Sequence, residues 1–217
     1  MQLLLDTADR AAAEPLLATG VFDGITTNPT ILRRAGLTVD DIEDVHRWAL
    51  AAGARQVFFQ SWGADTESLL SRGRELRALG DRVVVKLPAS PAGTTACARL
   101  AAEAVPTLLT AVYSPGQAMV AAAIGATYIA PYLGRMDDAG RDGVTTVLAM
   151  HEVLRATGAP TRVLAASIRD VASMVELARR GVDAFTMAPP VAERLFADPL
   201  TDEAVRMFEA HAAGRPS

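Results

Sequence analysis

The sequence predicts an α/β protein, a single-domain (β/α)8 TIM barrel with an extra C-terminal helix, and three observations support this prediction. Short apolar runs alternate with longer segments of helical periodicity along the chain. No GxGxxG motif follows the first apolar run, which argues against an open dinucleotide-binding sheet. The length of 217 residues is close to the lower size limit of a complete barrel. We therefore expect one catalytic domain over residues 1–217.

The strands are expected in the apolar runs, which are short and bounded by glycine, proline or polar residues. The runs are apolar almost throughout, which is typical of parallel strands buried on both faces. Alternation of such strands with helices about eight times favours a closed barrel over an open sheet. The runs are residues 3–5, 24–27, 57–60, 83–87, 107–112, 128–132, 163–167 and 184–187.

The helices are expected in the amphipathic, alanine-rich segments between these runs. Ser90 followed by Pro91, and Ser114 followed by Pro115, are typical of helix starts. Beyond the repeat, residues 199–213 predict one more helix, which we expect to pack on a barrel face or a neighbouring subunit. The segments between the runs are residues 40–52, 66–79, 94–103, 117–124, 144–156 and 168–180.

The composition indicates a cytoplasmic protein that acts on small molecules. The net charge is −4, and there is no long basic stretch and no apolar run of membrane-spanning length, so we expect neither nucleic acid nor membrane as a partner. The chain starts without a charged and then apolar leader, as expected of an unexported protein. Cys97 is the only cysteine, which excludes an internal disulfide and a cysteine-based zinc cluster. His46, His151 and His211 lack metal-ligand spacing, so we expect no metal.

One residue departs from the composition of the rest of the chain. The sequence has twenty arginines and a single lysine, Lys86, which follows three valines at the end of an apolar run. Arginine stays protonated in proteins, whereas a lysine amine removed from water has a lowered pKa and becomes a nucleophile. The alternative, an edge lysine that keeps its ammonium in water, fits poorly with a central strand buried on both faces. Lys86 is therefore the candidate nucleophile.

Polar residues gather at the ends of the predicted strands. In a (β/α)8 barrel the active site lies at the carboxyl ends of the strands, because the loops there share one mouth. Seven of the eight predicted ends are polar or charged, and only Met187 is apolar. The candidate site residues are Asp6, Thr26, Asn28, Gln60, Lys86, Thr110, Tyr132, Arg135, Ser167 and Arg169.

Several of these polar residues also have a structural alternative. Asp6 and Ser167 could be helix N-caps, and Ser167 has an acidic residue at capping-box spacing. Residues 26–29 could be an ordinary turn. Arg135 and Arg169 could form surface ion pairs instead of binding an anion. Their acidic neighbours in the sequence are Asp137, Asp138 and Asp170.

Six short motifs occur in order along almost the whole chain. They read LDT from Leu5, TTNPT from Thr26, VKLP from Val85, TAVY from Thr110, APY from Ala130 and AAS from Ala165. Together they resemble the small transaldolase and fructose-6-phosphate aldolase family, and TTNP and VKLP are specific when found together. The resemblance implies a class I aldolase of the pentose phosphate pathway that acts on sugar phosphates and dihydroxyacetone. It also implies a ring of identical subunits, of which a decamer is one form.

The same resemblance implies roles for the candidate residues. Lys86 would form a Schiff base with the keto carbon of the substrate, and no cofactor is implied because the imine withdraws the electrons that a metal would otherwise withdraw. Asp6 and Asn28 would bind the hydroxyls of the three-carbon donor, with Asp6 also placed for proton transfer. Thr26 would support that wall of the site. Arg135, Ser167 and Arg169 would hold the acceptor phosphate.

Three positions favour an aldolase over a transferase within the family. Transaldolases usually carry Glu where this chain has Gln60, Ser where it has Ala130, and Phe where it has Tyr132. Gln60 cannot accept a proton as a base and could only orient a water molecule, which leaves proton transfer to Tyr132 and Thr110. We therefore expect cleavage of fructose 6-phosphate to dihydroxyacetone and glyceraldehyde 3-phosphate, and the reverse reaction.

Other functions stay open at this point. A transaldolase would transfer the dihydroxyacetone unit between sedoheptulose 7-phosphate and fructose 6-phosphate, and residues 134–138 resemble the equivalent loop of small transaldolases more closely. Trp62 departs from both patterns, and a large side chain near the mouth would alter the acceptor. A barrel that binds sugar phosphates without turnover is a more distant alternative. Covalent chemistry at Lys86 distinguishes it from an enzyme.

Overall fold

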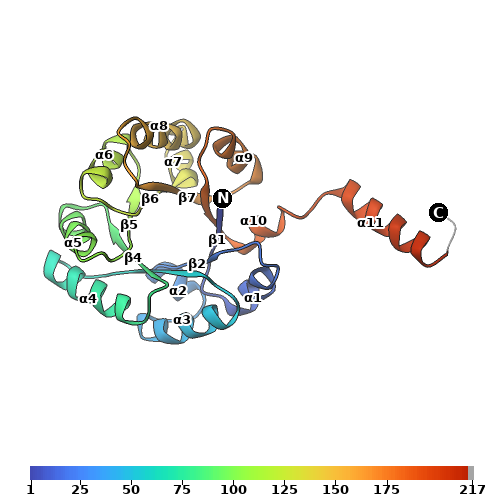
Figure 1. Ribbon diagram of the computed structural model, residues 1–217, viewed down its shortest axis with the longest axis horizontal. Helices are drawn as coiled ribbons and strands as arrows, with labels where there is room; N and C mark the ends of the chain where they lie inside the picture. The colour runs from blue at the N-terminus through green and yellow to red at the C-terminus, as the bar shows by residue number, and fades with distance from the viewer. Residues whose placement is uncertain (215–217) are drawn as a thin grey trace.

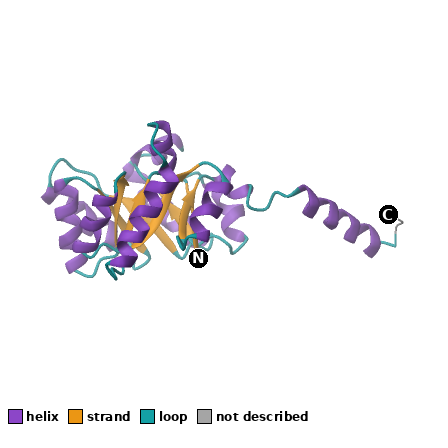
Figure 2. Ribbon diagram, turned by 90° about the horizontal axis from the view of Figure 1, so that it is seen from above, coloured by secondary structure: helices purple, strands orange, loops and turns teal. Residues whose placement is uncertain are grey.

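The structure is a computed structural model that describes residues 1–214, so the last three residues of the predicted domain, 215–217, lie outside the described residues. Eight parallel strands pair in chain order and close into a barrel, which confirms the predicted fold. Figure 1 shows the helices as an outer ring, and Figure 2 shows the tilted strands between them. The strands are β1 (Gln2–Asp6), β2 (Gly24–Thr26), β3 (Gln56–Gln60), β4 (Val83–Pro88), β5 (Thr107–Val112), β6 (Tyr128–Pro131), β7 (Arg162–Ile168) and β8 (Ala184–Met187).

The outer ring contains the six predicted helices and several shorter ones that the sequence pattern does not indicate. Two predicted helices begin earlier than their periodicity suggests, at Pro91 and Pro115, where the Ser-Pro signals lie. Most of the shorter helices have three to six residues, too few for a periodic pattern, whereas the first has nine residues with Pro15 inside it. The helices are α1 (Arg10–Ala18), α2 (Pro29–Arg34), η1 (Val39–Asp41), α3 (Ile42–Ala51), α4 (Thr66–Ala78), α5 (Pro91–Ala102), α6 (Pro115–Ala123), α7 (Leu133–Asp138), α8 (Gly143–Ala156), α9 (Val171–Arg179), α10 (Pro189–Glu193) and α11 (Pro199–Ala212).

The expected start of one helix is wrong. Ile168 ends β7, and α9 begins three residues later, where the Asp170 carboxylate accepts a hydrogen bond from the backbone of Ser173. Asp9, not Asp6, caps α1 in the same way. Asp6 and Ser167 are therefore not helix caps, and both of these residues face the mouth of the barrel.

The strand residues alternate between the barrel interior and the helices. Val84 belongs to the interior cluster, whereas Val83, Val85 and Leu87 pack against the surrounding helices. A residue two positions after an interior residue also faces the barrel interior, but it lies nearer to the open end of the barrel. Lys86 is related to Val84 in this way on β4. The interior cluster consists of Leu4, Phe58, Val84, Leu108, Tyr128, Ala130, Leu164, Ala166 and Ala184.

Two strands depart from this alternation just below the mouth. The pairing register shifts in β5 at Ala111 and in β7 at Ser167, and both residues have left-handed backbone angles, with φ values of 56° and 57°. This conformation is unfavourable for residues other than glycine by roughly 1 kcal/mol or more. As a result, consecutive residues of each strand line the cavity, Thr110 with Ala111 in β5 and Ala166, Ser167 and Ile168 in β7.

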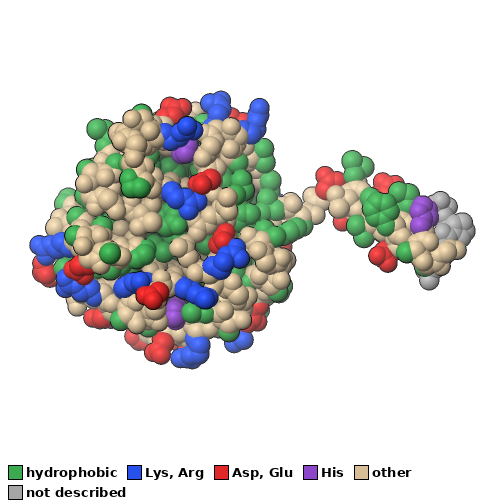
Figure 3. Space-filling view, viewed as in Figure 1, with side chains coloured by type: hydrophobic (Ala, Val, Ile, Leu, Met, Phe, Trp, Pro, Cys, Tyr) green, Lys and Arg blue, Asp and Glu red, His purple; other side chains and the backbone are tan. Residues whose placement is uncertain are grey.

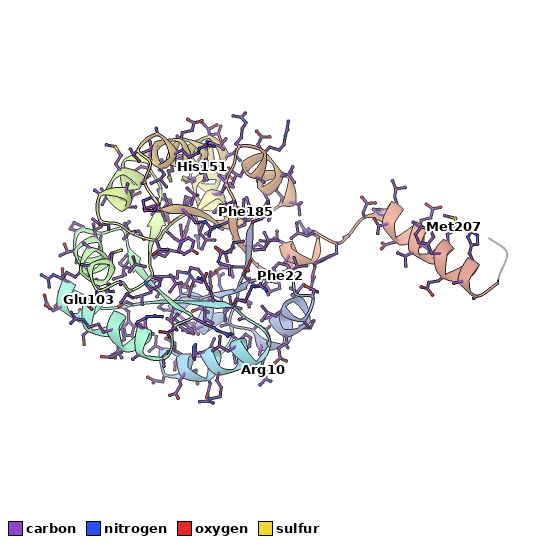
Figure 4. All side chains as sticks on the ribbon, viewed as in Figure 1. Arg10, Phe22, Glu103, His151, Phe185 and Met207 are labelled. Carbon is purple, nitrogen blue, oxygen red and sulfur yellow. The ribbon has the colours of Figure 1, made fainter. Side chains whose placement is uncertain are left out.

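The predicted C-terminal helix is present as α11, and it stands away from the barrel (Figures 1 and 2). Of the two expected positions, on a barrel face of its own chain or on a neighbouring subunit, the first is not found. No residue of α11 is buried, and Leu200 and Phe208 are 75% and 64% exposed. Figure 3 shows hydrophobic side chains exposed on the segment that stands away from the barrel, and Figure 4 shows Met207 of α11 far from the barrel.

Candidate active site

The main cavity of the barrel opens at the carboxyl ends of the strands and has a volume of about 730 Å³. All ten side chains that the sequence singles out line this cavity, although they come from six strands and from the loops and helices that follow them. Their placement agrees with the expectation that a barrel gathers its strand ends around one mouth.

Lys86 lies at the floor of the cavity, near the end of β4, and is 4% exposed. Its Nζ donates a hydrogen bond of 2.7 Å to the backbone carbonyl oxygen of Thr27. Burial lowers the pKa of the amine, and the nearby Asp6 carboxylate opposes that effect. A lowered pKa increases the fraction of neutral amine, which is the form that attacks a carbonyl carbon.

A chain of hydroxyls supports the carboxyl group of Asp6. Thr26 donates a hydrogen bond of 2.6 Å to Asp6 Oδ1, and its hydroxyl also lies 2.6 Å from that of Thr186. Because a threonine hydroxyl carries one hydrogen, Thr186 must donate to Thr26. Burial raises the pKa of Asp6, whereas Lys86, the Thr26 hydrogen bond and Arg34 act in the opposite direction. A carboxyl group with a raised pKa is suited to accept and return a proton.

Tyr132 and Thr110 form a second hydroxyl pair on another wall of the cavity. Their oxygen atoms lie 2.7 Å apart, and the Tyr132 ring packs edge-on against Tyr113 with centroids 5.8 Å apart. Burial raises the pKa of the Tyr132 phenol, so the phenol keeps its proton at neutral pH. Gln60 is the register neighbour of Lys86 on β3 and also lines the cavity.

Asn28 occupies the start of α2, where its Oδ1 accepts a hydrogen bond of 2.9 Å from the backbone N–H of Ile31. The capping bond uses the carbonyl of the Asn28 side chain, which leaves its amide N–H groups free to donate to a substrate hydroxyl. The same short helix ends at Arg34, which also lines the cavity.

The structure adds polar residues that the sequence analysis does not identify. Thr186 lies two residues beyond the interior residue Ala184, so the period of two could have identified it. Arg34 had no such signal, because α2 is too short to show a helical period. Asp138 also lines the cavity, whereas from the sequence we considered it only as an ion-pair partner.

The two arginines at the rim of the cavity differ in their partners. Arg169 forms a bidentate ion pair with Asp138, in which Nη1 lies 2.5 Å from Oδ1 and Nη2 also contacts Oδ2. Arg135 is exposed and forms no salt bridge with any residue in the described part of the chain. The ion-pair alternative is therefore found for Arg169 and not for Arg135.

Several other residues considered above lie outside the cavity. Trp62 does not line it, and its ring instead packs against the guanidinium of Arg72, which lies 4.6 Å from the ring centroid. Cys97 is buried, and burial raises the pKa of its thiol to about 11.

Over residues 1–214, no three acidic, histidine or cysteine side chains form a metal-binding group. No helix of the same residues is long and apolar enough to cross a membrane.

Comparisons with known proteins give a family match over almost the whole chain and several similar proteins. The family profile described as Transaldolase/Fructose-6-phosphate aldolase matches residues 3–215. A "Probable transaldolase" of Caulobacter sp. (strain K31) is 35% identical over 218 residues, 99% of this chain and 97% of that protein. A "Probable transaldolase" of Rhodospirillum centenum (strain ATCC 51521 / SW) is 38% identical over 215 residues, 97% of this chain and 90% of that protein.

Solved structures give a more distant likeness. A mandelate oxidase crystallised with (S)-2-phenylpropionate has a TM-score of 0.62 at 15% identity, over 88% of this chain and 65% of the oxidase chain. The chain thus spans slightly less than two thirds of the length of that oxidase. At this level of identity the likeness shows the barrel fold alone.

Proposed function

Because the chain belongs to the transaldolase/fructose-6-phosphate aldolase family, we propose that it is a Schiff-base enzyme that cleaves fructose 6-phosphate to dihydroxyacetone and glyceraldehyde 3-phosphate and catalyses the reverse reaction. The observation that carries this proposal is the single lysine of the chain, buried on the cavity floor with a lowered amine pKa. We infer from the same family that the enzyme works in the cytoplasm, in pentose phosphate metabolism.

The proposed reaction begins with Lys86. Its neutral amine adds to the keto carbon of the sugar to give a carbinolamine, which takes up one proton and loses water to give a protonated imine. The bond between C3 and C4 then breaks, its electron pair moves into the imine to form an enamine, and the C4 hydroxyl loses its proton as the aldehyde forms. Asp6 accepts that proton, because its carboxyl group has a raised pKa and lies near Lys86. Asn28 holds a donor hydroxyl through its free amide.

The second half of the reaction regenerates the amine. A proton is added to C3 of the enamine, water attacks the imine carbon, and dihydroxyacetone leaves. Tyr132 supplies the proton through a water molecule that Gln60 and Thr110 orient, which the short Tyr132–Thr110 contact supports. Arg135, Ser167 and Arg169 hold the phosphate of the acceptor at the rim, where all three line the cavity.

A transaldolase is the second candidate, because the matched relatives are named probable transaldolases. Such an enzyme keeps the enamine until an acceptor aldehyde arrives, whereas an aldolase protonates the enamine and releases a free ketone. We favour the aldolase because Gln60, Ala130 and Tyr132 line the cavity that holds Lys86. A phenol that keeps its proton supplies what the release of dihydroxyacetone requires.

The test uses the unmodified enzyme with fructose 6-phosphate alone. We expect free dihydroxyacetone and glyceraldehyde 3-phosphate, and little change in rate when erythrose 4-phosphate is added, as followed by chromatography of the products. Gln60→Glu should move the balance toward transfer, because a carboxylate can accept the proton that an amide cannot. Formation of sedoheptulose 7-phosphate without release of free dihydroxyacetone would instead establish the transaldolase.

We also propose that the enzyme is a homo-oligomer in which α11 packs against a neighbouring subunit. A stripe of apolar residues runs along α11 at positions 200, 204, 207 and 208, the spacing of one helix face, and within residues 1–214 none of them is buried. Burying it on a second copy would remove the exposed apolar surface from water.

For this assembly we expect light scattering after gel filtration to give a multiple of the chain mass of 22.8 kDa. Phe208→Asp should shift the protein toward the monomer, because a charge replaces a side chain that is 64% exposed in the single chain. Arg206→Asp, at a position outside the apolar stripe, is the control and should leave the mass unchanged. A monomeric unmodified protein would refute the proposal.

A further inference from the structure

The ion pair between Arg169 and Asp138 lies inside the candidate phosphate site. Both side chains line the cavity, and each is about half exposed, at 53% and 47%. Asp138 is the last residue of α7, the helix that also carries Arg135, and Arg169 follows the end of β7. The pair therefore joins the two elements from which the proposed phosphate ligands come.

The Asp138 carboxylate occupies the pair of terminal nitrogens of Arg169 that a substrate phosphate would use. The two oxygen atoms of Asp138 take one hydrogen from each of the two terminal nitrogens, which is the arrangement that a phosphate would also use. On the other side, α7 passes so close that a Cβ at Gly134 would lie 2.6 Å from Nε of Arg169. A substrate phosphate that binds Arg169 in a bidentate manner must therefore displace the Asp138 carboxylate.

We propose that Asp138 is a specificity-determining residue that competes with the substrate anion for Arg169. This inference rests on the proposed function, in which the acceptor phosphate binds at Arg135, Ser167 and Arg169. A ligand carboxylate carries one negative charge, as the Asp138 carboxylate does. Replacing Asp138 by such a ligand at Arg169 therefore brings no gain in binding free energy. A phosphate monoester has nearly two charges at neutral pH and three acceptor oxygens, so it displaces Asp138 at a gain. The pair thus favours phosphorylated aldehydes over carboxylated ones.

The test is titration calorimetry of the whole enzyme with inorganic phosphate and, separately, with acetate at pH 7.5. We expect Asp138→Asn to bind phosphate about threefold to tenfold more tightly, the range for removing a half-exposed competing ion pair. Acetate binding should become measurable in this variant, so that the preference for phosphate narrows. Asp138→Ala should behave in the same way, and thermal melting verifies that both variants are folded.

A matched control separates the contact from the loss of charge. Asp137 lies on the same helix, and its Oδ1 accepts a hydrogen bond of 2.9 Å from the backbone of Gly143 without touching Arg169. Asp137→Asn removes the same charge and should change phosphate affinity by less than about twofold. In an Arg169→Ala background, Asp138→Asn should leave phosphate affinity unchanged, because the guanidinium for which Asp138 and phosphate compete is absent.

The outcomes distinguish this inference from the proposed function. If phosphate binds and Arg169→Ala weakens it, but Asp138→Asn leaves binding unchanged or weakens it, Asp138 only holds Arg169 in place and the inference is overturned. If neither Arg135→Ala nor Arg169→Ala alters phosphate binding, or if no phosphate binds, the proposed phosphate site is wrong and the inference falls with it. Schiff-base formation at Lys86 can still be present in either case.

Discussion

Replacing Lys86 by methionine should reduce cleavage of fructose 6-phosphate by roughly 10⁴ or more, the order expected when a covalent nucleophile is removed. Methionine has a similar length and no charge, so it fits the buried position, which is 4% exposed. The variant leaves the carbonyl oxygen of Thr27 without its partner, at a cost of about 1 to 3 kcal/mol, but it also removes an amine whose charged form burial disfavours. Turnover and circular dichroism together check this prediction.

The arginine variant and the pH dependence of stability provide the controls. Lys86→Arg keeps a positive charge but has no nucleophilic amine, so it should be equally inactive. Burial lowers the pKa of Lys86 in the folded state, so between that lowered pKa and 10.5 only the unfolded state binds the proton. The unmodified enzyme should therefore gain stability relative to Lys86→Met as pH rises through this window. Substantial turnover by either variant would contradict the assigned role.

Tyr132→Phe should slow the release of dihydroxyacetone by about 10² to 10⁴, the usual effect of removing a general acid or base. The phenol lies 2.7 Å from Thr110, and its raised pKa keeps it protonated at the pH of the assay. Loss of the hydroxyl removes the donor for the enamine but leaves the amine of Lys86 intact. Stopped assays with fructose 6-phosphate should therefore show slow turnover although the Schiff base still forms.

Tyr113→Phe is the matched control for this substitution. Tyr113 packs edge-on against Tyr132, and it is not among the residues that line the cavity. Removing its hydroxyl should leave turnover within about twofold of the unmodified enzyme, since substitutions away from the site usually have small effects. Equal losses in the two variants would assign the effect to packing of the aromatic pair, and no loss in Tyr132→Phe would remove Tyr132 from the mechanism.

The fold and most of the site could be predicted because both follow from the period of two along parallel strands. Lys86 and Gln60 lie two residues beyond the interior residues Val84 and Phe58, so strand assignment alone places them at the mouth. The same rule places Thr186, which the sequence analysis overlooked. Strand ends are thus predictable wherever the strand is regular.

The remaining features depend on backbone paths that the sequence pattern does not encode. The left-handed conformations of Ala111 and Ser167 had no glycine to indicate them. Whether Arg169 pairs with Asp138 or with another acidic neighbour depends on how α7 lies against the end of β7. Arg34 reaches the cavity from a helix of six residues, which is too short to show a period.

Covalent trapping with dihydroxyacetone and borohydride detects a Schiff base at Lys86 directly. The chain contains one lysine, so Lys86 and the amino terminus are the only amines that can be reduced to a stable adduct. We expect one three-carbon adduct per chain, found by mass spectrometry on the peptide that contains Lys86, and no adduct in Lys86→Met. An unlabelled protein, or a label only on the amine of Met1, would contradict the Schiff-base mechanism.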